Sequence, residues 1–135
     1  MAKKPPSPAQ PPLCPCESGA AYSACCGRFI ADFEGTPAPD AEHLMRSRYS
    51  AFVREERAYL LATWHASTRP SQLDFEPQCR WLGLQVKAFE LLDDSHAEVE
   101  FVARYKLQGR AVRLHERSRF VQEQGRWFYL DGDQF

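Results

Sequence analysis

From residue 80 onward, apolar and polar residues alternate along the chain, which is the pattern of strands covered on one face. The alternation predicts four strands, over about residues 80–88, 97–105, 110–122 and 127–130. Turn residues separate them, namely Asp93-Asp94-Ser95, Gln108-Gly109 and Gln124-Gly125. Because such short connections join antiparallel neighbours, we expect a meander of four strands. In the first strand, Leu82, Leu84, Val86 and Ala88 form the apolar series.

Ahead of the strands, apolar residues recur at helical spacing. Asp40 can cap a helix there, and Glu42 lies in its first turn, where a negative charge is favourable. The charged run over residues 54–57 breaks or bends this helix, and a second helical segment over residues 58–64 ends before Pro70. The apolar residues of the first helix are Met45, Tyr49, Phe52 and Val53.

Two helices followed by hairpin-linked strands predict an α+β fold, in which a curved antiparallel sheet packs on amino-terminal helices. We assign residues 40–135, the body of the chain, to this domain and expect it to have a hydrophobic core of its own. Eight of the ten prolines lie in the first 39 residues. Residues 1–12 are Pro-rich and without periodicity, so we expect a disordered arm there.

Composition excludes several classes of protein. The formal net charge is −1, so no overall basic footprint for nucleic acid is present, although 13 of the 17 basic residues are Arg. The longest apolar stretch, around residues 59–64, is too short to cross a bilayer. Lys3 and Lys4 are not followed by an apolar segment, as they would be in a secretory signal. We therefore expect a cytoplasmic protein without a membrane span.

Four of the five cysteines lie within 13 residues, while Cys79 stands apart. Their pattern is Cys-x-Cys, eight residues, then Cys-Cys, and Gly19 permits the chain to turn back between the two pairs. Four thiolates at tetrahedral positions suit zinc first and mononuclear iron second. Disulfides or free thiols are the alternative interpretation, which a reducing compartment disfavours. The predicted metal ligands are Cys14, Cys16, Cys25 and Cys26.

Residues 13–30 resemble the SEC-C motif, the small metal-binding module at the carboxyl end of the SecA translocase motor. The resemblance implies that the same four cysteines are ligands and that Tyr22 is the usual aromatic residue. Glu17 stands where the motif normally has Gly, and alanines and a serine replace its usual lysines. By analogy with SecA, the motif implies contact with a partner protein, with a nucleic acid or ribosome contact as a weaker expectation.

The chain as a whole resembles the YchJ family of uncharacterised bacterial proteins. Members of this family pair a SEC-C segment with a cone-shaped domain like nuclear transport factor 2. The similarity covers residues 13–135. It is carried by the segments over residues 43–52, 63–65, 81–84 and 116–120. The family has no assigned reaction, so the resemblance implies an architecture more than an activity.

Alternation in the third strand places Glu116 and Ser118 on the face that the helices cover. A carboxylate there needs a partner or a wet cavity. One interpretation is a structural ion pair with Arg46 or Arg48, another is a bulge that turns Glu116 outward. The third is a pocket in which Glu116, Tyr49, Trp64 and His65 gather, with Glu116 as a general base.

On the opposite face of the third strand, His115 alternates with arginines, where Glu98 and Glu100 of the preceding strand can pair with them. A solvated charge ladder is the main interpretation, and contact with a phosphate or RNA is the alternative.

The sequence therefore supports two hypotheses about function. The first is a zinc-binding adaptor whose cysteine segment contacts a partner protein. The second is a small-ligand binder or acid/base enzyme that uses the pocket around Glu116. Whether the chain is an enzyme stays open, and a cavity with Glu116 facing inward favours the second hypothesis.

Overall fold

The structure is a computed structural model, and it describes residues 12–135. The predicted disordered arm, residues 1–12, lies outside the described residues except for Pro12. The short helices are η1 (Tyr22–Ala24), α1 (Cys26–Ala31), α2 (Ala41–Val53) and α3 (Arg57–Ala62). The strands are β1 (Cys79–Asp93), β2 (His96–Leu107), β3 (Arg110–Glu123) and β4 (Arg126–Gln134).

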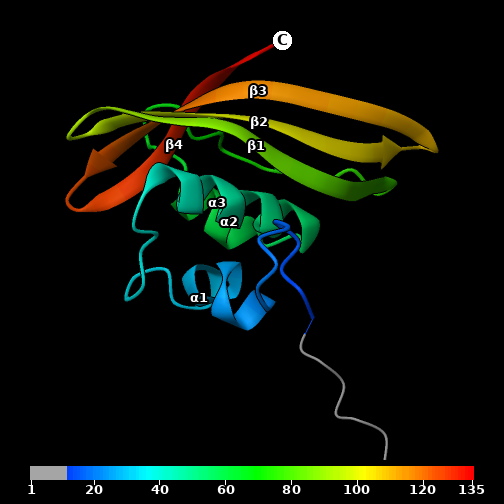
Figure 1. Cartoon of the computed structure of the whole chain (residues 1–135), viewed down its shortest axis with the longest axis horizontal. Coiled ribbons are helices and arrows are strands. Elements are labelled where there is room, and N and C mark those ends of the chain that lie inside the picture. The colour runs from blue at the N-terminus through cyan, green and yellow to red at the C-terminus, as the bar shows by residue number, and fades with distance from the viewer. Residues whose placement is uncertain (1–11) are drawn as a thin grey trace, which may run out of the picture.

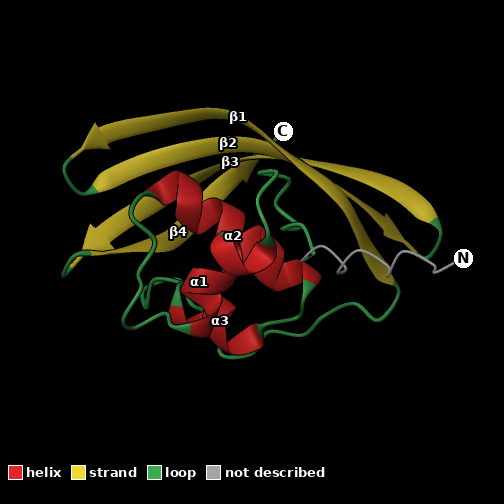
Figure 2. Ribbon diagram, turned by 60° about the horizontal axis from the view of Figure 1, so that its bottom comes forward, coloured by secondary structure: helices red, strands yellow, loops and turns green. Residues whose placement is uncertain are grey.

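The four strands form one antiparallel sheet in the order β1-β2-β3-β4. This is the predicted meander, and the α+β fold class is confirmed. The helices lie on one face of the curved sheet, with α2 and α3 next to it and α1 on their far side (Figures 1 and 2). The molecule therefore has three layers, and α2 is in the middle one.

Helix α2 begins where the sequence places its cap. The Asp40 carboxylate accepts a hydrogen bond from the backbone N–H of His43 at 2.8 Å, which satisfies one of the free donors of the first turn. After Val53 the chain leaves the helix, and Glu55 takes a positive φ of 56°. The predicted break between the two helices is thus confirmed.

Strand β1 carries register shifts, and one of them changes which residues face the helices. Between Trp81 and Gly83 the pairing with β2 skips a residue, so the alternation of side chains is reversed at this point. As a result the expectation that Leu82 is covered is wrong, because its side chain is 45% exposed. Trp81 faces the helices instead, and its ring lies 5.5 Å from that of Tyr49.

The hydrophobic core does not end at the linker between the cysteine segment and the body. Cys14, Cys16, Cys26 and Phe29 are buried in one continuous cluster with residues of α2, α3 and the sheet. The expected separate core of residues 40–135 is therefore only part of a larger one. The body's share of this cluster includes Leu44, Met45, Tyr49, Leu60, Val99, Phe101, Phe120 and Trp127.

The face of the sheet turned away from the helices carries the predicted charge ladder. Arg117 forms ion pairs with Glu98 at 3.0 Å, Glu100 at 3.4 Å and Glu90 at 2.8 Å. His115 lies with Nε2 3.0 Å from a carboxylate oxygen of Glu100. These cross-strand pairs confirm the main interpretation of this stripe.

Candidate functional site

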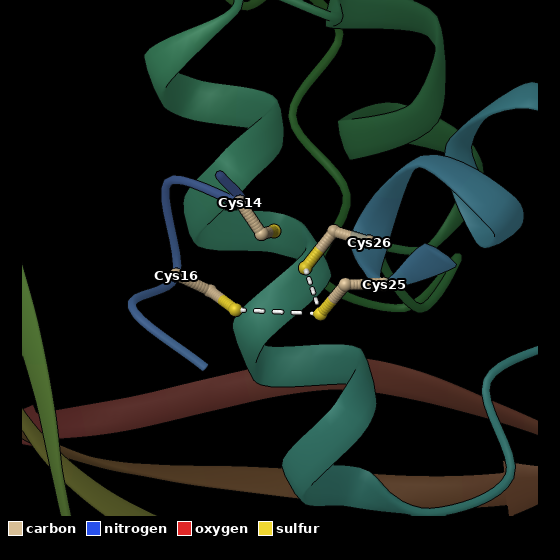
Figure 3. A group of neighbouring side chains, drawn as sticks. All are labelled: Cys14, Cys16, Cys25 and Cys26. Atoms are coloured by element: carbon tan, nitrogen blue, oxygen red, sulfur yellow. Dashed lines mark hydrogen bonds between the residues drawn. The ribbon is translucent and has the colours of Figure 1, made fainter. Parts of the chain in front are cut away.

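The cysteine cluster is built from a tight turn and the start of a short helix. The backbone N–H of Cys14 donates to Ala20 at 2.9 Å and that of Glu17 donates to Cys14 at 3.1 Å, which closes the turn that carries Cys14 and Cys16. Cys25 and Cys26 follow η1, at the beginning of α1. The two pairs face one another across a short gap beside α2 (Figure 3).

The spacing of the four sulfur atoms matches a tetrahedral metal centre. All four lie within 4.8 Å of one another, with Cys16 to Cys25 at 3.7 Å and Cys25 to Cys26 at 4.0 Å. Four sulfurs around zinc at about 2.3 Å would be about 3.8 Å apart in a regular tetrahedron. The same distances are far longer than a disulfide bond, and all five cysteines are free thiols. The cluster therefore has the ligand set and the spacing for one ion.

Burial makes the cluster a closed site. The cysteine side chains are 4% exposed at Cys14, 0% at Cys16 and 1% at Cys26, and Cys25 is half-buried. Catalytic zinc sites keep a position open for water or substrate, whereas structural sites are closed by four protein ligands. The burial of the cysteines therefore resembles that of a closed site and not that of a catalytic one.

Side chains outside the cysteine set hold these sulfurs in place. The Ser50 hydroxyl lies 3.5 Å from the Cys14 sulfur and the Ser18 hydroxyl lies 3.1 Å from that of Cys25. Arg46 donates from Nη1 to the carbonyl oxygen of Cys16 at 3.0 Å. Sequence reasoning did not identify Arg46 or Ser50 in this role, although their spacing of four residues places them on one face of α2.

The crowding of the sulfurs shifts their acidity in opposite directions. The interaction with Cys26 lowers the pKa of the Cys16 thiol, and the same interaction raises the pKa of Cys26. Burial raises the pKa of Cys25. Adjacent thiolates repel one another, and a bound cation offsets that repulsion because its own charge is the largest in the site.

Glu17, the departure from the usual SEC-C glycine, has a structural role. Its φ of 63° lies in the left-handed region that favours glycine. Its carboxylate accepts a hydrogen bond from the backbone N–H of Leu84 at 2.9 Å, on the free edge of β1. A Cβ at Gly83 would lie 3.2 Å from the same carboxylate, so glycine leaves the space that Glu17 uses. This contact connects the cysteine turn to the sheet.

A cavity of about 290 Å³ lies on the other side of α2, between this helix and the sheet. Glu116 faces inward and lines it together with Tyr49 and Trp64, which is the third of the three interpretations of this face. The outward bulge considered for Glu116 is therefore wrong. The lining residues are mostly aromatic or aliphatic: Met45, Tyr49, Phe52, Trp64, Trp81, Phe101, Ala103, Leu114, Phe120 and Tyr129, with Arg48, Glu116 and Ser118 as the polar ones.

Glu116 is held by neighbours in the sheet. The Ser118 hydroxyl donates a hydrogen bond to Oε2 of Glu116, and a Cβ at Gly132 would lie 2.7 Å from the same oxygen. The expected ion pair with Arg46 or Arg48 is wrong, because neither arginine pairs with Glu116 within residues 12–135.

Arg48 is the buried cation of the cavity, and sequence reasoning considered it only as an ion-pair partner. Its Nη1 donates to the carbonyl oxygen of Leu60 at 2.8 Å and to the hydroxyl of Thr63 at 2.7 Å. The guanidinium lies over the rings of Trp64 and Tyr129, at 5.1 and 4.7 Å from their centroids. Burial lowers the pKa of Arg48 to about 10, so it still carries a positive charge at neutral pH.

His65 does not join the cavity, contrary to expectation. Its Nε2 lies 2.7 Å from a carboxylate oxygen of Glu123, and its Nδ1 lies 2.7 Å from the Ser67 hydroxyl. The backbone N–H of His65 donates to Tyr129 in β4, which turns the side chain toward Phe128. His65 therefore helps to attach the segment after α3 to the sheet.

Comparison with known families finds two matches along the chain. Residues 13–28 match the SEC-C motif, and residues 40–132 match the family described as "YchJ, middle NTF2-like domain". Among the residues that the structure describes, no helix has the length and apolar character that crossing a membrane requires.

Curated relatives share most of the chain. A UPF0225 protein of Polaromonas sp. (strain JS666 / ATCC BAA-500) is 65% identical over 127 residues, which are 89% of this chain and 91% of the relative. A UPF0225 protein of Bordetella parapertussis is 59% identical over 134 residues, which are 97% of this chain and 98% of the relative.

Solved structures have the same fold. The solution structure of a SEC-C motif containing protein from Rhodopseudomonas palustris superimposes with a TM-score of 0.80 at 32% identity, over 90% of this chain and 98% of that one. A crystal structure of a SEC-C motif containing protein from Psychrobacter arcticus gives a TM-score of 0.74 at 31% identity, over 87% and 80% of the two chains.

Proposed function

The chain belongs to the YchJ (UPF0225) family, with a SEC-C motif ahead of an NTF2-like domain, and from this premise we propose that it is a zinc-binding protein. In this proposal Cys14, Cys16, Cys25 and Cys26 hold one ion as thiolates. The observation that carries it is the placement of four sulfurs within 4.8 Å of one another in a closed, largely buried cluster. Zinc is preferred over iron because a closed set of four sulfurs is typical of structural zinc.

The proposed ion stabilises the attachment of the amino-terminal segment to the body. The cysteine turn contributes few large apolar side chains, and its contacts with α2 are made by Arg46 and Ser50. Cross-linking four points of the amino-terminal segment through one ion would add to the small apolar core that the segment shares with the body.

Elemental analysis of the purified protein tests this proposal directly. We expect one equivalent of zinc per chain, and we expect Cys16→Ser to lose most of it because the fourth thiolate is gone. Cys79→Ser is the matched control, since Cys79 lies outside the cluster, and it should retain one equivalent. A native protein without metal, or equal metal contents in both variants, would contradict the proposal.

The expected partner protein stays a prediction, as do nucleic acid or ribosome contact and the cytoplasmic location. The cysteine cluster already packs one side against α2, so a partner would meet the other side, near the exposed turn over residues 17–20. A partner that recognises this turn should lose affinity for Cys16→Ser and not for Cys79→Ser.

The cavity favours small-ligand binding as a second candidate function. Its volume of about 290 Å³ is at the lower end of the range for ligand pockets, and its mostly apolar lining with a few polar groups is typical of them. The inward-facing Glu116 carboxylate is the observation that favours this candidate. A role for Glu116 as a general base would require a bound substrate with an acidic proton within hydrogen-bond distance.

A further inference from the structure

The polar groups of the cavity are not fully used by the protein. Arg48 makes its hydrogen bonds from Nη1, which leaves Nε and Nη2 without a partner among residues 12–135. Glu116 accepts a hydrogen bond from Ser118 at Oε2, and its Oε1 has no such contact within the described residues. Among the described residues, Nε1 of Trp64 is the only fully buried side-chain nitrogen or oxygen that lacks a hydrogen-bond partner. The unpartnered atoms of Arg48 and Glu116 are therefore not fully buried, and both residues line the cavity.

The two charges lie in one cavity without forming an ion pair. Among the described residues no ion pair joins Glu116 to an arginine, although Arg48 lines the same cavity and interacts with Glu116 electrostatically. The cavity thus offers one hydrogen-bond donor group and one acceptor group, with charges that cancel. A ligand with an acceptor next to a donor would satisfy both at once.

Charges at and beside the cavity disfavour an ionic ligand. A neighbouring groove shares Phe52, Trp81 and Leu114 with the cavity and is lined by three carboxylates. These carboxylates, from Glu55, Asp74 and Glu76, repel an approaching anion. Inside, Arg48 repels a cation and Glu116 repels an anion, so neither ion meets a net attraction there. A neutral molecule meets neither penalty.

The walls and the volume of the cavity indicate a flat ligand. Rings of Tyr49, Phe52, Trp81, Phe101 and Phe120 are among the lining side chains, so they can stack on or pack edge-on against a planar molecule. The volume of about 290 Å³ is roughly twice that of an engineered apolar cavity of about 150 Å³ that holds one benzene ring. Two fused rings are therefore close to the upper limit of size.

We infer that this cavity binds a neutral, planar heteroaromatic molecule of up to two fused rings, whose edge carries an N–H donor beside a carbonyl or ring-nitrogen acceptor. The N–H donates to Oε1 of Glu116 and the acceptor receives a hydrogen bond from Arg48. Nucleobases and related bicyclic lactams have such an edge. This inference rests on the second candidate function, the use of the cavity for a small ligand.

A series of probes that share one bicyclic frame separates the possible ligand chemistries. Quinolin-2-one supplies the neutral donor and acceptor edge, and its N-methyl derivative lacks the donor. N-methylquinolinium is a cation of similar size, and quinoline-2-carboxylate is an anion. Binding is measured on the full chain by proton–nitrogen correlation NMR of the tryptophan indole groups. Trp64 and Trp81 line the cavity, whereas Trp127 does not and is an internal control.

We expect quinolin-2-one to shift the indole signals of Trp64 and Trp81 and not that of Trp127. Blocking the N–H by methylation should weaken binding about tenfold or more, since a hydrogen bond to a charged group is lost. Glu116→Gln should weaken the binding of quinolin-2-one by a similar factor. Glu98→Gln, on the opposite face of the sheet, should leave it unchanged. Ala103→Leu, which fills part of the cavity, should weaken all four probes.

The possible failures are distinct. If the N-methyl derivative binds as tightly as quinolin-2-one, or if a charged probe binds more tightly, the inferred ligand class is wrong while the cavity remains a ligand site. If no probe shifts Trp64 or Trp81 at millimolar concentrations, both the ligand class and the second candidate function are wrong. Binding that Ala103→Leu leaves intact would place the probe elsewhere and would also overturn the inference.

Discussion

The cysteine cluster and the cavity lie on two sides of the same helix, and they are built in different ways. The four cysteines come from 13 consecutive residues, and Arg46 and Ser50 of α2 contact that segment. The cavity takes its walls from α2, from the residue Trp64 after α3, and from all four strands. One site is thus local in the chain and the other depends on the whole fold.

This difference separates two sources of stability. The proposed ion holds a segment that buries few large apolar side chains, whereas aromatic packing and the hydrogen bonds of Arg48 support the cavity. Because α2 is shared, a change at one site can reach the other through this helix. Variants on each side of α2 show whether a change at one site alters the stability or the metal content of the other.

The largest expected effect is that of Cys16→Ser. The variant removes one of the four proposed ligands and leaves a polar hydroxyl at a fully buried position. We expect the free energy of unfolding, measured by urea titration, to fall by about 4 kcal/mol. Protection from hydrogen exchange should decrease in residues 13–30 and also in α2, because the core is continuous between them.

The matched control for this prediction is Cys79→Ser, which should change the free energy of unfolding by less than about 1 kcal/mol. If exchange in Cys16→Ser becomes faster only within residues 13–30, the body is independent of the cysteine segment. That result would restore the sequence-based expectation of a separate core.

The next effect in size concerns the cavity side of α2. Arg48→Met keeps an unbranched side chain, shorter than that of arginine, and removes the hydrogen bonds to Leu60 and Thr63. We expect a loss of about 2 kcal/mol in the free energy of unfolding, because a buried carbonyl group loses its donor. Arg104→Met, at an exposed position, should change it by less than about 0.5 kcal/mol.

Metal content separates this variant from the previous one. Arg48→Met should retain one equivalent of metal per chain, because Arg48 does not contact the cysteines. Loss of metal in this variant would mean that the two sides of α2 are not separable, and it would contradict the comparison.

The cysteine cluster could be predicted from the sequence because its four cysteines are close in the chain and their spacing is typical of a metal centre. The turns of the sheet were predictable for a similar reason, since Gly109 and Gly125 adopt the positive φ values that such turns require. Helix α1 was not expected, because it has six residues, includes Gly27 and depends on the packing of Phe29.

The cavity could be predicted only in part. The alternation in β3 placed Glu116 and Ser118 on the covered face, and Tyr49 followed from the helical spacing of α2. The contribution of Trp81 depends on a register shift in β1 that no local pattern reveals. His65 was misplaced because its hydrogen bond with β4 is a contact between distant parts of the chain.

A smaller effect is expected at Glu17, which links the cysteine turn to β1. Glu17→Ala keeps the cost of a positive φ and loses the hydrogen bond to Leu84, so we expect a loss of about 1 to 2 kcal/mol in the free energy of unfolding. Glu17→Gly loses the same bond but relieves the backbone by about 1 kcal/mol, so it should be close to neutral. Equal losses in the two variants would show that the backbone is not strained here.

The smallest effect belongs to the charge ladder, on the face of the sheet opposite the cavity. Hydrogen bonding to His115 lowers the pKa of the Glu100 carboxyl, so the contribution of this group to stability is present above its unfolded pKa and is lost as the pH falls through its folded pKa. Stability should therefore decrease between about pH 5 and pH 3, with a shallower slope in Glu100→Gln. Urea titrations at several pH values measure both slopes, and identical slopes would contradict the assignment.

X-ray absorption spectroscopy at the metal edge of the native protein is the most direct test of the proposed centre. We predict zinc with four sulfur neighbours at about 2.3 Å and no nitrogen or oxygen neighbour. A first coordination shell with fewer than four sulfurs, or protein that lacks metal and carries its amino-terminal cysteines as disulfides, would contradict the account.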